Sequence, residues 1–162
     1  MAVRDPALVE AFDRGTAAFF REFSFLPHRD VSGGFLVPAS SPEGFDVSVR
    51  AGEDGVTLET GGGFHLHFDD GGPAVELVRR ALGVVLELLS ADARIIELRA
   101  GGMAYRWRLE LLRNGQWRRS DSMGLLIWNI FGRRSRAILQ NDYFATCPLN
   151  DSPRESSDAA AG

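Results

Sequence analysis

The sequence predicts an α+β fold, with one antiparallel sheet of about six strands in a meander and two helices packed on one face of it. Three observations lead to this expectation. Two segments carry apolar residues at helical spacing, several others alternate between apolar and polar residues, and short turns link the alternating segments. Links of hairpin length join antiparallel neighbours, whereas a parallel sheet needs long crossovers.

The first helix is expected over residues 6–23. Asp5 precedes it in a capping position, and Pro6 suits the first helical turn because a missing N–H costs nothing there. Gly15 weakens the helix by about 1 kcal/mol relative to alanine, which points to a close neighbour at this position. Four apolar residues recur on one helical face: Leu8, Phe12, Phe19 and Phe23.

Residues 24–43 are rich in glycine, proline and serine, and they are expected to form a loop with one short strand at residues 35–37. Strands follow. Alternation on both sides of the Asp54–Gly55 pair predicts a hairpin, and residues 64–69 alternate again after three consecutive glycines.

The second helix, expected over residues 73–90, is the clearest element of the chain. Its polar and glycine positions lie on one narrow stripe, at 76, 79, 80, 83, 87 and 90. The remaining positions are apolar, so the helix is expected to be buried on most of its circumference, beside the sheet and a further element or a second subunit. Glu76 is expected to pair with Arg80 one turn later.

The chain after this helix reads as a further meander. Residues 95–99 and 105–112 alternate, and Asn114–Gly115 is the strongest hairpin signal in the sequence. The apolar run at residues 124–131 is expected to be a central strand, and residues 136–141 an edge strand or a short helix.

Residues 148–162 have almost no apolar content and are expected to form a disordered polar tail. Residues 1–147 are then expected to form a single α+β domain. A single cysteine, Cys147, excludes an internal disulfide, and no apolar run approaches the length of a membrane span. The chain also shows no secretory signal, so the sequence predicts a cytoplasmic protein without a membrane interaction.

The basic residues are distributed unevenly along the chain. All 18 are arginines, and the formal net charge is −4. Residues 1–92 hold 15 acidic residues against 7 arginines, a net charge of −8, whereas residues 93–140 hold 3 against 10, a net charge of +7. Either these halves neutralise each other inside the fold, or the molecule presents an acidic and a basic face that can steer a partner.

Two arginine groups lie next to turns in the basic segment, where side chains are expected to project outward. Arginine and tryptophan are common in protein-binding hot spots, and arginine forms bidentate contacts with carboxylates. The expected partner is therefore a protein with an acidic surface. The expected partner-binding residues are Trp117, Arg118, Arg119, Arg133, Arg134 and Arg136.

The sequence also offers one possible metal site. His65 and His67 lie two residues apart on a strand, so both point to one side, and Asp69 follows on that side. The alternating Phe64, Leu66 and Phe68 form the obvious core face, which places the histidines on the solvent face. They are therefore expected to bind no metal.

These observations favour a small cytoplasmic, non-enzymatic protein-binding domain of the immunity, chaperone or adaptor type, with no cofactor and with a homodimer as a possible state. Two alternatives remain open. One is a small metal-assisted hydrolase or isomerase at His65, His67 and Asp69. The other is a nucleic-acid binder using the arginines of residues 118–136, which the overall acidity makes unlikely.

Overall fold

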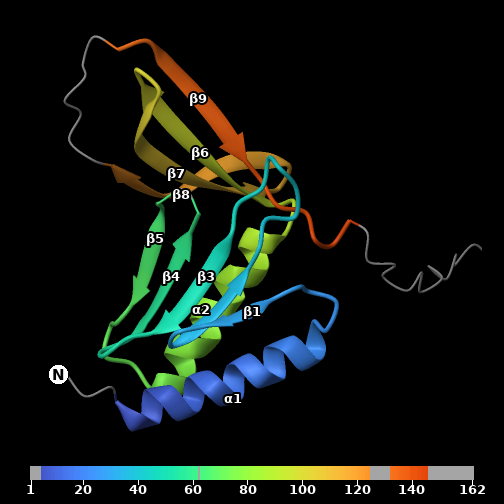
Figure 1. Cartoon of the computed structure of the whole chain (residues 1–162), viewed down its shortest axis with the longest axis vertical. Helices are drawn as coiled ribbons and strands as arrows, with labels where there is room; N and C mark the ends of the chain where they lie inside the picture. The colour runs from blue at the N-terminus through green and yellow to red at the C-terminus, as the bar shows by residue number, and fades with distance from the viewer. Residues whose placement is uncertain (1–4, 62, 125–131, 146–162) are drawn as a thin grey trace, which may run out of the picture.

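The structure, a computed structural model, describes residues 5–61, 63–124 and 132–145. Within these residues the chain forms two helices and nine strands, which Figure 1 labels in chain order. Their bounds are α1 (Pro6–Glu22), β1 (Arg29–Val31), β2 (Gly34–Val37), β3 (Val47–Ala51), β4 (Val56–Thr60), β5 (His65–Phe68), α2 (Ala74–Leu89), β6 (Ala93–Ala100), β7 (Met103–Arg113), β8 (Gln116–Gly124) and β9 (Arg134–Leu139).

The strands form two antiparallel sheets, so the α+β class holds but the single meander of about six strands is not confirmed. The first sheet is a meander in the order β1-β2-β3-β4-β5, and the second has the order β8-β7-β6-β9. β6 pairs with β7 along one edge and with β9 along the other. Because both of its edges are occupied, β6 cannot continue the first sheet, and the chain after α2 closes into a sheet of its own.

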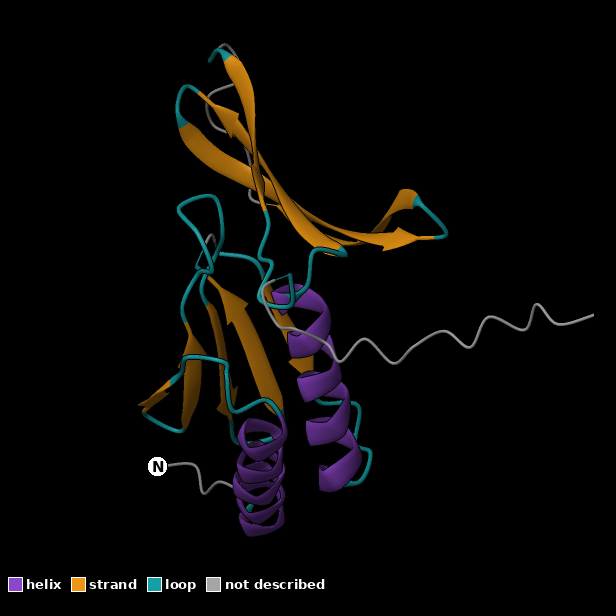
Figure 2. Cartoon of the chain, turned by 90° about the vertical axis from the view of Figure 1, so that its right-hand side faces the viewer, coloured by secondary structure: helices purple, strands orange, loops and turns teal. Residues whose placement is uncertain are grey.

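Both helices pack on one face of the five-stranded sheet, and the four-stranded sheet lies beyond one end of α2 (Figure 2). Alternate residues of the first sheet point at the helices and are fully buried, as Val47, Val49 and Leu58 show. The same core continues into the second sheet through Ile95 and Leu109. One apolar core therefore joins the two sheets through α2.

The local signals for α1 are confirmed. Asp5 caps the helix, because its Oδ1 accepts the Ala7 N–H at 2.9 Å, and Pro6 occupies the first turn. The close neighbour expected at Gly15 is Val78 of α2. A Cβ atom at Gly15 would lie 2.7 Å from Val78 Cγ1, closer than side chains tolerate. Gly15 thus allows the two helices to approach each other.

α2 is buried on its sheet-facing side, including Val85 and Leu88, which have no exposed surface. Its outer side is less covered than expected, because Val75 is 59% exposed. The ion pairs on the polar stripe also differ from the expectation: Glu76 pairs with Arg79 at 2.6 Å. Arg80 pairs instead with Asp70, which precedes the helix, at 2.7 Å.

The loop predicted between the first helix and the hairpins contains more pairing than expected. β1 and β2 form an additional hairpin, and β2 continues into the sheet by pairing with β3. The segment expected as an edge strand or a short helix is the edge strand β9.

Several sequence expectations fall outside the described residues. They concern the apolar strand beyond Gly124, the polar tail at residues 148–162 and Cys147. Among the described residues, no helix has the length and apolar content needed to span a membrane.

Candidate functional site

The residues predicted to bind a partner lie on or beside the two edge strands of the four-stranded sheet. Trp117, Arg118 and Arg119 belong to β8, Arg134 and Arg136 belong to β9, and Arg133 directly precedes β9. β7 and β6 lie between these edges. Moreover, Arg134 pairs with Ala100 beside the β6–β7 turn, at the opposite end of the sheet from Asn114–Gly115. The two arginine groups therefore do not form one compact cluster.

The pleat of the sheet nevertheless brings most of these residues to one face, because directly paired residues on neighbouring strands point the same way. Arg119 pairs with Glu110, which pairs with Arg94. Leu98 lies between Arg106 and Arg136 in another such row. We call this surface the arginine face. It carries Arg94, Arg106, Arg108, Arg119, Arg134 and Arg136, with Trp117, Ile96, Leu98, Leu112 and Ile138 between them.

Two of the predicted residues do not share this surface. Arg118 pairs with Leu111 and points to the opposite face of the sheet. Arg133 lies outside the strand, where its carbonyl accepts the Gly101 N–H at 3.0 Å. The predicted set is thus divided, with Trp117 and the remaining three arginines on the arginine face.

The sequence interpretation missed Arg94, Arg106 and Arg108. The signal for the last two was present, because they alternate with the apolar residues of β7, and alternation places them together on the non-core face. The prediction included instead arginines that are adjacent in sequence, such as Arg118 and Arg119. On a strand, however, residues two apart share a face and adjacent residues point to opposite faces. Arginines two apart therefore gather on one face of the sheet, whereas adjacent arginines are divided between its two faces.

The main core uses the other face of this sheet. Ala93, Ile95, Trp107 and Leu109 pack into the core from that side, whereas no residue of the arginine face belongs to it. Ile138, on the arginine face, is 43% exposed. The described helices therefore do not pack on the arginine face, although Ile96 within it is buried.

Within the described residues, four of the six arginines on this face make no ion pair. Arg94 pairs with Glu110 at 2.7 Å, and its guanidinium stacks 4.0 Å above the Trp117 ring. Arg134 stacks on the Tyr105 ring. Four arginines make no ion pair within residues 5–61, 63–124 and 132–145, namely Arg106, Arg108, Arg119 and Arg136.

Two details strengthen this imbalance. The Nε of Arg108 is buried and has no hydrogen-bond partner in the described structure. Glu110, already held by Arg94, is the only acidic residue that the described register places on this face. In the described structure, the acidic residues of positions 1–92 form no ion pair with the four arginines named above, and this face stays positively charged.

The histidine pair lies where the sequence placed it, on the exposed side of β5. The His65 and His67 rings are 5.0 Å apart, and His67 Nδ1 lies 3.0 Å from the Thr57 hydroxyl. Asp69 lines a small hollow with His67, but His65 does not. The described residues contain no group of three or more histidine, cysteine, aspartate or glutamate side chains arranged to hold a metal ion. The metal-assisted alternative thus has two neighbouring imidazoles as its structural support.

Comparisons with models of known protein families, with curated protein sequences and with solved structures find no match to this chain. Its function must be inferred from the chemistry of its surfaces.

Proposed function

We propose that this protein is a non-enzymatic, cytoplasmic protein-binding domain that receives an acidic segment of another protein on the arginine face. One observation supports this most strongly. Four arginines without an ion pair in the described structure lie among apolar side chains on a sheet face that the core does not use. Unpaired guanidinium groups bind carboxylates through paired N–H donors, which stabilises such a contact more than a single charge would.

The apolar side chains on the arginine face favour a protein over a nucleic acid. Leu98, Leu112 and Ile138 separate the arginines and are not buried, and an acidic peptide with interspersed apolar residues can satisfy both kinds of contact. Nucleic-acid binding needs a continuous basic surface. Here Arg118 points to the opposite face, and the whole chain is acidic.

The direct test measures the fluorescence anisotropy of three labelled probes of equal length. They are a peptide alternating glutamate and leucine, the same peptide with glutamine for glutamate, and a single-stranded oligonucleotide. We expect saturable binding of the acidic peptide only. Binding of the oligonucleotide alone, with an affinity that falls steeply as salt rises, would support the nucleic-acid alternative. Binding of none of the probes would contradict the proposal.

A matched pair of variants locates the contact. The double variant Arg106→Glu with Arg136→Glu changes the charge of the arginine face. The control, Arg14→Glu with Arg21→Glu, makes the same change in charge at two exposed positions of α1. The first variant should weaken binding of the acidic peptide at least tenfold, equivalent to about 1.4 kcal/mol. The second should bind within about twofold of the wild type. Equal weakening in both variants would show that only the net charge matters.

A further inference from the structure

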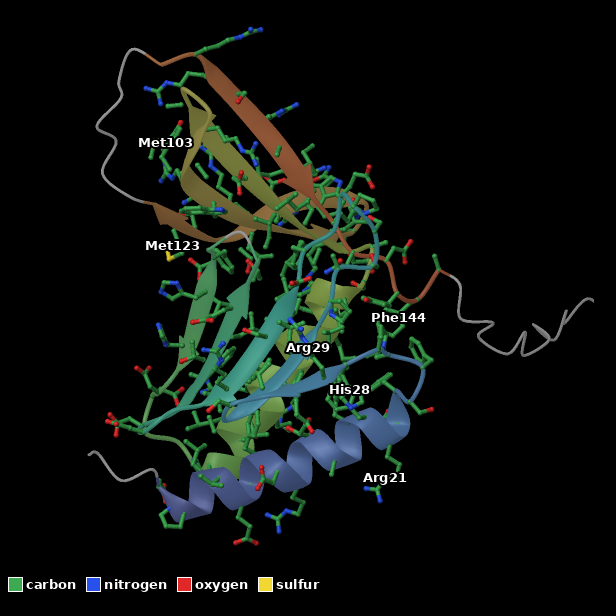
Figure 3. The ribbon with its side chains drawn as sticks, in the orientation of Figure 1. Arg21, His28, Arg29, Met103, Met123 and Phe144 are labelled. Atoms are coloured by element: carbon green, nitrogen blue, oxygen red, sulfur yellow. The ribbon has the colours of Figure 1, made fainter. Side chains whose placement is uncertain are left out.

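A second hollow, of about 500 Å³, lies between α1 and the β1–β2 hairpin. Val9, Asp13, Thr16 and Phe20 recur on α1 at spacings of four, three and four, so one stripe of the helix forms a wall. Asp30 of β1 and His28, the residue before this strand, form the opposite side. Figure 3 shows His28 between β1 and α1. This volume is within the range of pockets that bind small molecules.

Aromatic rings form much of this pocket. The Phe20 ring stacks on the His28 ring with their centroids 3.5 Å apart, and it meets Phe35 edge to face at 4.9 Å. Phe12 stacks on Phe35, and both are buried beneath the pocket. The faces of such rings carry partial negative charge and attract cations.

The hydrogen bond of His28 identifies which of its ring nitrogens carries a proton. Its Nδ1 lies 3.2 Å from the Leu26 carbonyl oxygen, which can only accept, so Nδ1 carries the proton of this hydrogen bond. In the neutral imidazole the other ring nitrogen, Nε2, is then an acceptor.

Three further polar side chains of the pocket have no partner within the described residues. The side chains of Asp13 and Asp30 make no ion pair or hydrogen bond within the described residues, and none of the described lining residues is an arginine. The Thr16 Oγ1 is buried and has no hydrogen-bond partner there. A buried hydroxyl without a partner is unusual in a native protein.

We propose that this pocket binds an organic cation with N–H donors, a guanidinium or alkylammonium group. The Phe20–His28 ring stack, which is not buried, receives the cation, and the Asp13 and Asp30 carboxylates balance its charge. The site is independent of the function proposed for the arginine face, which has the opposite charge. α1 also lies at the far end of the molecule from the four-stranded sheet (Figure 1).

The test is a titration followed by NMR signals of the His28 and Phe20 rings. The probes are agmatine, a glycine-arginine-glycine peptide with blocked ends, and the same peptide with citrulline, which keeps the shape of arginine without its charge. We expect saturable shifts with both cations and none with citrulline. Tighter binding of agmatine would identify a free small molecule as the source of the cation, and tighter binding of the peptide would identify a protein side chain.

Two double variants complete the test. Asp13→Asn with Asp30→Asn should weaken cation binding at least tenfold. Asp54→Asn with Asp69→Asn removes the same charge from the separate hollow beside His67 and should have no such effect. Both changes concern exposed carboxylates, and the amide spectrum verifies folding. Equal shifts with citrulline, equal weakening in both variants, or no shift at about 10 mM cation would overturn the proposal.

Discussion

Asn141 holds the peptide groups on both sides of Phe45. The Phe45 N–H donates to Asn141 Oδ1 at 3.3 Å, and Asn141 Nδ2 donates to the Phe45 carbonyl at 2.9 Å. The same amide receives the Ser40 N–H at 3.1 Å and lies 3.3 Å from the Leu88 carbonyl, to which it donates. Asn141 is fully buried. One side chain thus fastens the segment after β9 to the loop before β3 and to the end of α2.

Replacing Asn141 with alanine should therefore destabilise the protein by roughly 2–4 kcal/mol, because each buried group left without a partner costs about 1–3 kcal/mol. Urea unfolding measures this loss. The neighbouring Gln140→Ala is a suitable control, since Gln140 is only half-buried and its side chain donates to a single carbonyl, that of Ala91. It should cost less than about 1 kcal/mol. Equal losses for the two variants would contradict the role assigned to Asn141.

The approach of the two helices predicts a coupling between Gly15 and Val78. Gly15→Ala improves helix propensity by about 1 kcal/mol, but its Cβ would meet Val78 Cγ1 at 2.7 Å. In the wild type the clash should offset or exceed the gain, since overpacking costs about 1–3 kcal/mol. In a Val78→Ala background the same change should stabilise the protein. Unfolding free energies of the four proteins give the coupling, and additivity within about 0.5 kcal/mol would exclude it.

Two leucines on opposite sides of α2 should respond differently to truncation. Leu88→Ala should cost roughly 2–5 kcal/mol, because Leu88 has no exposed surface. Leu86 is half-buried and lines an apolar groove with α1, so Leu86→Ala should cost less than about 1.5 kcal/mol.

The homodimer expected from the apolar character of α2 is tested on the same proteins by light scattering. A larger effect at Leu86 than at Leu88 would indicate that a second subunit buries the groove.

Local signals were sufficient for the helices and most hairpins. The cap at Asp5, the glycine at position 15 and the alternation of β3, β4 and β7 each depend on residues close in sequence. The division into two sheets depends on which distant strand pairs with β6. β9 occupies that edge, and no alternation pattern identifies a partner so far along the chain. For this reason the sequence predicted one sheet, whereas the pairing of β6 with β9 gives the structure two.

The arginine face was predicted only in part for the same reason. Trp117 and Arg119 were singled out from their position near a turn, which is local information. Arg106 and Arg94 join them through cross-strand pairing, which becomes definite only once the register is known. Asn141 was not recognised at all, because an asparagine that satisfies a buried loop has the same sequence context as one in a solvated turn.

Tyr143 should make the stability of the protein sensitive to alkaline pH. Its hydroxyl donates to the Pro38 carbonyl at 2.7 Å. Burial raises the pKa of Tyr143, and the negative charge of Asp46 raises it further. Since the folded state favours the neutral phenol, the stability contributed by this group is fully present below the unfolded pKa of about 10 and is lost as pH rises through the folded pKa.

The composition of the chain makes this titration unusually clean. All basic side chains are arginines, which stay protonated over this range, and the sequence contains two tyrosines. In a Tyr105→Phe background, ultraviolet absorbance reports Tyr143 alone and should give a midpoint above that of a denatured sample. Asp46→Asn should move the midpoint down while leaving it above the denatured value, because burial is the larger cause. A midpoint equal to that of the denatured chain would mean that Tyr143 is solvated and that its contact with Pro38 does not persist in solution.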